Sequence, residues 1–463
     1  MKKYIAFALC ASVFCGCAGY ILGTSNSQMD FKQEFANPNC QSTDFLQKQM
    51  EKVNKNDDPI FIAINAGSIA RSCGDFNKSN EFFDLAESKY KNDVDLESIG
   101  KKGAKLATSL VLSDAFNDYD GNMYERIMVN TYKGFNFMSL GDYENARVEF
   151  NRVALRQEVA KEYFKQEIAK AKEEQEKAKK DPSYTKEVQN GIEEVKSEYE
   201  HLFDGYNVAK EFTNPYASYA QAVFSFMDKD YAKAIDKFKE ISAINKKAVP
   251  FEKNFSKAAN SVKGGKNYIF LAFEDGLGSE KDEFKLTIPL PINGKITATS
   301  LAFPKIVKRD ASLKTISLNG EQSFEIANFD DIFATEFKIE LPQIILNSVM
   351  SSVAKGVAAG AVANNTSGIG GGLVSLGAGA LLSEINKTDT RSWLSLPKTA
   401  SIAMVENTGS YIIKDSNGNE ISKGNIEKNK NALIWVRSVS GSKPLVVVII
   451  KMWFYKTASM ILA

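Results

Sequence analysis

The chain has 463 residues, with 58 Lys and Arg against 57 Asp and Glu, and so a formal charge of +1 at neutral pH. This balance argues against nucleic-acid binding, which normally requires a basic face. The single histidine, His201, excludes histidine-dependent catalytic triads and multi-histidine zinc sites, and its charged helical surroundings indicate an exposed side chain.

The start of the chain is similar to a bacterial lipoprotein signal. The uncharged run at 4–14 is too short to span a bilayer, which needs ~20 apolar residues, but it suits a secretory signal. Gly16 precedes Cys17, the thiol that this resemblance marks for cleavage and lipid attachment. Ala18 and Gly19 follow instead of the aspartate that retains many lipoproteins in the inner membrane. We therefore expect an outer-membrane anchor facing the periplasm; an ordinary secretion signal or an uncleaved anchor is the alternative.

Cleavage before Cys17 would remove Cys10 and Cys15 and leave Cys40 and Cys73. Two thiols in an oxidising compartment are more often bridged than free. A disulfide between them would stabilise the fold by about 3–4 kcal/mol in the loop-entropy model. The alternative is a pair of buried, reduced cysteines.

Three segments of the first half share one spacing. Each has a small residue, a turn residue seven positions later, an aspartate with an aromatic, and then a small residue and a phenylalanine. The segments run Gly67, Gly74, Asp75-Phe76, Ser79, Phe83; Gly134, Gly141, Asp142-Tyr143, Ala146, Phe150; and Ala222, Lys229, Asp230-Tyr231, Ala234, Phe238. The spacing predicts antiparallel helix pairs of the tetratricopeptide type, with a degenerate pair near 96–117.

The helical repeats are expected to form a solenoid over 46–260, with a coiled-coil-like helical hairpin inserted at 158–202 and broken at Asp181-Pro182-Ser183. The charge of the insertion indicates a solvated face, or else a partner-binding coiled coil. Stacked helix pairs leave a concave surface that suits protein or peptide capture. The candidate residues for that surface, each of which could equally be core between repeats, are Arg71, Thr131, Phe135, Met138, Tyr219 and Phe226.

The pattern changes from helical to alternating after residue 265. Expected strands lie at 268–273, 284–288, 296–303, 313–318, 322–327, 401–406, 410–415, 431–439 and 445–452. A helix is expected to start at Asp330-Asp331, and Asn417-Gly418 to form a hairpin turn. The acidic cluster of Glu274, Asp275, Glu280, Asp282 and Glu283 lacks the spacing of a calcium loop and indicates an exposed polar hairpin.

A Gly/Ala-rich helical segment is expected at 341–385, and no charged residue occurs from Gly356 to Leu382. Asn364-Asn365 and the glycines at 370–372 divide this run into pieces too short to cross a bilayer. A buried helical hairpin is one interpretation. A membrane-active or oligomerising segment is the other.

Several stretches together resemble a family of uncharacterised bacterial lipoproteins with tetratricopeptide-like N-terminal halves. They are Tyr124 to Phe150, Asn214 to Tyr219, Phe273 to Pro289, Phe303 to Ile306, Ala334 to Pro342 and Asp389 to Pro397. The resemblance implies a component of envelope assembly. It supplies no catalytic residues, and the Gly-rich run departs from the helical stretch expected there.

These observations predict an α+β chain: a signal peptide at 1–16, a lipidated linker at 17–45, the solenoid, and a β-rich α+β domain at 266–463 in which the last strands join the first. We expect no enzyme, because no catalytic constellation is present, and no cofactor or metal. The expected function is an outer-membrane-anchored periplasmic lipoprotein that binds an envelope protein or peptide as a scaffold. The alternative is a membrane-active or pore-associated oligomer that uses 356–382.

Overall fold

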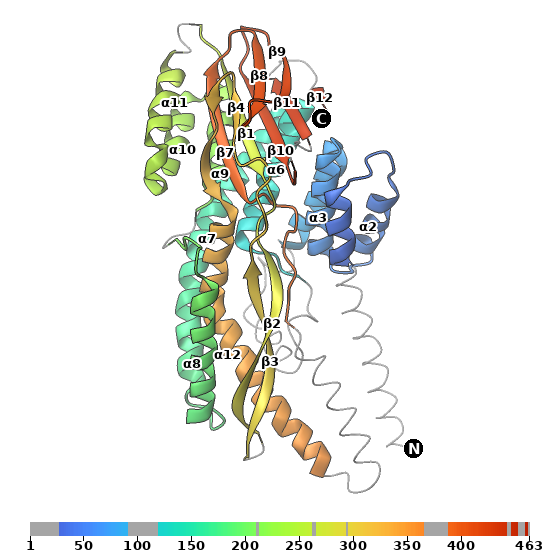
Figure 1. Ribbon diagram of the computed structural model, residues 1–463, viewed down its shortest axis with the longest axis vertical. Coiled ribbons are helices and arrows are strands. Elements are labelled where there is room, and N and C mark those ends of the chain that lie inside the picture. Colours follow the sequence, from blue (N-terminus) through green and yellow to red (C-terminus); the bar gives the residue numbers. More distant parts are fainter. Residues whose placement is uncertain are drawn as a thin grey trace.

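The computed structural model describes residues 27–90, 119–209, 213–261, 265–292, 295–364, 388–441, 446–451 and 459–461. Cys17, the degenerate pair near 96–117 and the Gly/Ala-rich run from 365 onward lie outside the described residues. The protein is mixed α+β, with helices dominating its first half and sheets its second (Figure 1).

Helices occupy most of the described chain before residue 261, and one long helix follows later. Besides a helical stretch at 27–36, they are α2 (Asp44–Asn54), α3 (Pro59–Ser72), α4 (Phe76–Lys89), α6 (Met123–Leu140), α7 (Tyr143–Ala178), α8 (Lys186–Leu202), α9 (Pro215–Met227), α10 (Tyr231–Ile244), the 3-10 helix η3 (Lys246–Ala248), α11 (Val249–Ser261) and α12 (Phe329–Asn364).

The close helix pairing predicted from the repeated spacing is confirmed for α3 with α4 and for α6 with α7. A Cβ atom built on Gly67 would lie 2.6 Å from the ring of Phe83, and one on Gly134 would lie 2.6 Å from the ring of Phe150. Any larger side chain there would push the second helix away. The aspartate of each turn caps that helix, as when Asp142 accepts a hydrogen bond from the backbone N–H of Asn145.

The strands form three groups in the described part of the chain. The first sheet has the order β12 (Ser459–Ile461), β11 (Val446–Lys451), β10 (Ala432–Ser438), β1 (Tyr268–Asp275), β7 (Thr399–Glu406) and β6 (Phe324–Asn328). The second has the order β5 (Glu321–Gln322), β4 (Ile316–Leu318), β8 (Ser410–Asp415) and β9 (Glu420–Asn425), while β2 (Glu280–Ile292) and β3 (Lys295–Val307) form a hairpin. Every predicted strand overlaps an observed one, whereas β9 and β12 are not anticipated by the sequence pattern.

Strand β1 lies inside the first sheet, parallel to β10 and antiparallel to β7. Among the described residues, the final predicted strand, at 445–452, does not itself pair with the strands at 268–327. Instead, β10 pairs with β1, and β11 extends the same sheet through β10. The polar stretch after β1 is not a hairpin turn, however. The chain leaves the sheet there, and among the described strands β2 pairs with β3 alone.

Strand β1 is buried on both faces, because helices cover one face of the first sheet and the second sheet covers the other. This explains its continuous apolar sequence "YIFLAF". Phe270 and Ala272 belong to the core shared with the helices, whereas Ile269, Leu271 and Phe273 pack against the second sheet. Helices α3, α6 and α9 cover the first of these faces, as contacts such as that between the rings of Phe226 and Phe270 show. One hydrophobic core is therefore shared by the helices before residue 260 and the sheet after it, across the domain boundary that the sequence predicts there.

The β2–β3 hairpin extends away from the sheets beside α7, α8 and α12 and makes the molecule elongated (Figure 1). Its buried Ile288 and Leu290 approach Gly191 of α8. The predicted break at Pro182 is confirmed, since α7 ends at Ala178 and α8 begins at Lys186. The insertion does not start at 158 as predicted, because α7 runs without interruption from Tyr143. Among the described residues no helix combines the length and apolar character needed to span a membrane.

The predicted disulfide is present. The sulfurs of Cys40 and Cys73 are bonded, and the bond ties the chain before α2 to the end of α3. The side chain of His201 is 80% exposed, as its charged surroundings predict.

The N-terminus of α6 rests on a carboxylate from α12. The oxygens of Glu336 accept hydrogen bonds from the backbone N–H groups of Met123 at 2.5 Å and Tyr124 at 3.1 Å. Burial, and then the nearby charge of Glu340, raise the pKa of Glu336 from its usual 4.5 to about 8, although the two N–H groups oppose the shift.

We expect this carboxyl to make the fold less stable as pH rises. Between about pH 4.5 and 8 the folded chain keeps a proton that the unfolded chain releases, so the free energy of unfolding falls across that window. Because one pKa unit is worth about 1.4 kcal/mol, the loss should be on the order of a few kcal/mol. Urea unfolding at pH 5 and pH 8 should show a smaller decrease for Glu336→Gln than for the wild type. Equal decreases would contradict the assignment, and Glu321→Gln, at an exposed glutamate, is the control.

Candidate functional site

The six residues predicted for a concave binding surface are all buried. Their exposed fractions range from 0 to 3%: Arg71, Thr131, Phe135, Met138, Tyr219 and Phe226. Contacts to the chain's own sheet account for several of them. The Tyr219 hydroxyl donates to the carbonyl of Leu271 at 2.9 Å, and the Arg71 guanidinium lies 4.1 Å from the ring centroid of Trp435. The sheet thus covers the surface on which the partner was expected, and these side chains have internal roles.

The acidic cluster is also placed differently from the prediction, because Glu274 and Asp275 are fully buried. Glu274 follows Phe270 and Ala272 at alternate positions of β1 and so points toward the helices. Its carboxylate accepts hydrogen bonds from the hydroxyls of Tyr132 at 3.0 Å and Tyr216 at 2.7 Å.

Two further groups from the sheet complete the surroundings of Glu274. The indole Nε1 of Trp435 donates to its carboxylate at 2.8 Å, and Nε of Arg437 lies 3.8 Å away. Burial, and then the charge of Glu274, raise the pKa of Tyr132 and Tyr216 well above the usual range, so both hydroxyls keep their protons and donate. This arrangement joins the helices to the sheet and leaves the carboxylate no contact with solvent.

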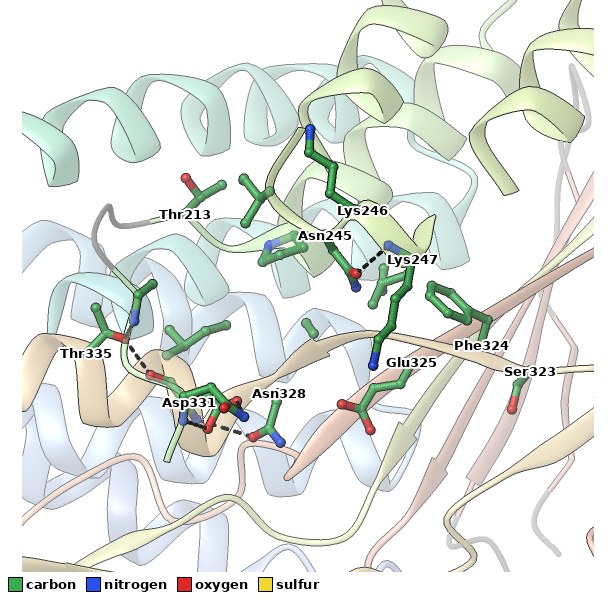
Figure 2. Close-up of a pocket in the computed structure, with 17 residues that line it drawn as sticks. Thr213, Asn245, Lys246, Lys247, Ser323, Phe324, Glu325, Asn328, Asp331 and Thr335 are labelled. Atoms are coloured by element: carbon green, nitrogen blue, oxygen red, sulfur yellow. Dashed lines mark hydrogen bonds between the residues drawn. The ribbon is translucent and has the colours of Figure 1, made fainter. Parts of the chain in front are cut away.

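A cleft lies at the outer edge of the first sheet, where β6 meets α12 and the end of α10 (Figure 2). Its volume is about 760 Å³, within the range of about 300–1,000 Å³ typical of ligand sites. The residues around it are Asn207, Ala209, Thr213, Pro215, Ile244 to Lys247, Ser323 to Asn328, Asp331, Ile332 and Thr335.

The floor of the cleft is the edge of β6. Among the described strands, β6 ends the sheet and pairs only with β7, so one side of its backbone has no described strand beside it. Six consecutive residues, 323–328, line the cleft. Because successive side chains of a strand point to opposite faces, an uninterrupted run of this kind indicates that the backbone edge itself faces the cleft.

One wall is fixed by hydrogen bonds at the start of α12. The carboxylate of Asp331 accepts from the backbone N–H of Asn207 at 2.9 Å and from its side-chain amide at 3.2 Å. The hydroxyl of Thr335 accepts from the backbone N–H of Ala209 at 3.0 Å. Asn328 caps the helix by accepting from the N–H groups of residues 330 and 331. These bonds hold the chain at 207–209 against α12 and shape that end of the cleft.

The opposite wall is charged and less constrained. Ile244 is 50% exposed at its rim, and Lys246 and Lys247 are both exposed. Lys247 reaches toward Glu325 of β6, while Lys246 points away from the strand (Figure 2). Partial desolvation, and then the charge of Asp331, raise the pKa of Glu325, and Lys247 opposes this shift.

Chemically, the cleft offers a backbone edge, apolar side chains and charges of both signs. Within the described residues, no group of three or more His, Cys, Asp or Glu side chains is placed to hold a metal ion. The sequence pattern predicts the strand at 322–327 and the helix after it, but not that this strand is an edge. That property depends on β7, whose pairing partner the local pattern does not identify.

Comparison of the chain with protein-family models, with curated proteins and with solved structures gives no match.

Proposed function

We propose that the protein is a lipid-anchored scaffold of the bacterial cell envelope that binds another protein at the β6 cleft. The observation that carries this proposal is the cleft itself, where an unpaired strand edge lies beside exposed apolar and charged side chains. The six residues that the repeat register predicts for binding are all buried, which favours the cleft over the helical pairs as the docking site.

The helix pairs then have a supporting role in this proposal. We propose that they are tetratricopeptide-like units whose inner face holds the chain's own sheet in place of a foreign peptide. The contacts of Tyr219 and Arg71 with that sheet support this view. The elongated body, with the β2–β3 hairpin projecting from it, suits a protein that holds a partner at a distance from its anchor.

The docking site can be tested by photo-crosslinking in living cells. A benzoylphenylalanine at Ile244, at the cleft rim, should give a discrete adduct with an envelope protein. The matched control is Ile296, near the turn of the β2–β3 hairpin, which is 59% exposed against 50% for Ile244. Equal adducts at the two positions, or none at Ile244, would refute the cleft as the docking site.

The anchor requires a separate test, on a residue outside the described part of the chain. If Cys17 carries lipid, globomycin should cause the unprocessed precursor to accumulate, and a Cys17→Ser variant should not be processed at that position. Mass spectrometry of the native N-terminus would show a diacylated cysteine. An unmodified amine at another residue would end this part of the proposal.

A further inference from the structure

We infer that the β6 cleft takes an extended peptide segment of the partner protein, which pairs with β6 as an additional antiparallel strand and places an acidic side chain near Lys247. This inference rests on the proposed function and specifies the chemistry of its partner. Its three supports are the free strand edge, the charge of one wall and the shape of β6.

The backbone edge provides the main recognition. An edge strand presents unpaired N–H and C=O groups, and an extended peptide satisfies them through main-chain hydrogen bonds while neighbouring pockets select its side chains. In the cleft these pockets would be apolar, since Phe324 is half-buried in the floor and Ile332 is 9% exposed in the wall. A peptide of alternating apolar and polar residues would match both the edge and the pockets.

The charges at the two ends of β6 favour an acidic residue at one end of the peptide. Lys247 stands beside Phe324 and Glu325, at the N-terminal end of β6, and Asp331 lies at the other end (Figure 2). Lys246 points away from the strand, so Lys247 is the lysine that an added strand would meet (Figure 2). An antiparallel strand would bring its C-terminal residues to Lys247, so an acidic side chain there would be attracted.

The shape of β6 limits the length of the pairing. The register with β7 shifts between Glu325 and Ala327, which marks a bulge. Bulges twist a strand and interrupt long regular pairing, so the added strand should be short.

The experiment measures binding of labelled hexapeptides to the mature chain by fluorescence anisotropy. The probe is Thr-Val-Thr-Val-Glu-Glu, and two controls isolate its features. One replaces both glutamates with lysines, and the other carries N-methyl groups on the valines, which remove backbone donors and keep the side chains. We expect saturable binding of the probe and at least about tenfold weaker binding of each control, equivalent to ~1.4 kcal/mol.

A charge reversal in the protein should reverse the preference between the two charged peptides. Lys246→Glu with Lys247→Glu is the test variant, and Lys253→Glu with Lys257→Glu is the matched control, since these exposed lysines of α11 do not line the cleft. The control should bind like the wild type. An unchanged preference in the test variant would refute the role of Lys247.

The remaining outcomes separate this inference from the proposed function. Equal binding of the N-methylated peptide, or no saturable binding of the probe, would overturn strand addition even if Ile244 crosslinks to a partner in cells. A dimer of the chain that the probe dissociates would assign the cleft to a second copy and also overturn the inference. Peptide binding without any crosslink at Ile244 would leave the chemistry of the cleft intact and refute the proposed function.

Discussion

Replacing Glu274 with alanine should lower the free energy of unfolding by about 3–5 kcal/mol, the cost of removing one partner from a buried charged group. The substitution takes away the acceptor of three hydrogen bonds, from Tyr132, Tyr216 and Trp435. It also leaves the buried guanidinium of Arg437 without its nearest carboxylate. Helices and sheet would both lose partners, and the loss should therefore appear as destabilisation of the whole chain.

Urea unfolding followed by circular dichroism measures this effect. Asp282→Ala is the control, because Asp282 belongs to the same acidic cluster in the sequence but its side chain is 58% exposed beside Lys305. Its loss should change stability by no more than ~0.5 kcal/mol, as is usual at the surface. Similar values for the two variants would contradict a structural role for Glu274.

Replacing Trp393 with alanine should cost about 3–5 kcal/mol, as is typical for removing a large aromatic side chain from a core. Trp393 is 2% exposed and lies in an irregular segment at 388–398 that passes between helices. Its ring contacts those of Phe83 and Tyr132, and its indole N–H donates to the hydroxyl of Ser68 at 2.8 Å.

Trp393→Phe separates packing from hydrogen bonding at this position. Phenylalanine keeps most of the buried area but cannot donate to Ser68, so the expected loss is smaller, with the hydrogen bond itself worth about 0.5–1.5 kcal/mol. The midpoints of urea unfolding of the two variants give the comparison. If the phenylalanine variant were as unstable as the alanine variant, the hydrogen bond to Ser68 would contribute more to stability than the packing of the ring.

Local signals account for the elements that the sequence predicts well. The Gly-Asp turns with their caps predict where α4 and α7 begin, and Pro182 predicts the break between α7 and α8. The apolar run at 268–273 predicts β1. In each case the physical cause lies within a few residues of the effect, which is why a single sequence suffices.

Pairings between distant segments could not be predicted in this way. The parallel register of Ile269 with Ala432 joins strands that neither turn chemistry nor periodicity connects. Glu274 illustrates the consequence, because a charged residue after an apolar strand usually indicates a turn. Here its position continues the alternation of β1 and places it against Tyr132 and Tyr216.

The candidate site shows the same limit. Arg71 and Phe135 fit a concave repeat surface as long as the rest of the fold is ignored, but both are buried, Arg71 against Trp435 of β10. The β6 cleft depends on which strand ends the sheet, and that is decided by the pairing of β7 with β1 and β6. Without these pairings, the sequence identifies the residues at 322–327 but not their role.

The parallel pairing of β1 with β10 has a consequence for biogenesis. A chain that is synthesised N-terminus first exposes α3, α6 and α9 long before residues 432–438 arrive to complete the sheet that covers them. Contacts so remote in sequence slow folding, and the waiting apolar surface favours aggregation. The nascent protein should therefore depend on holdase chaperones, and premature termination before β10 should yield a product that proteases remove.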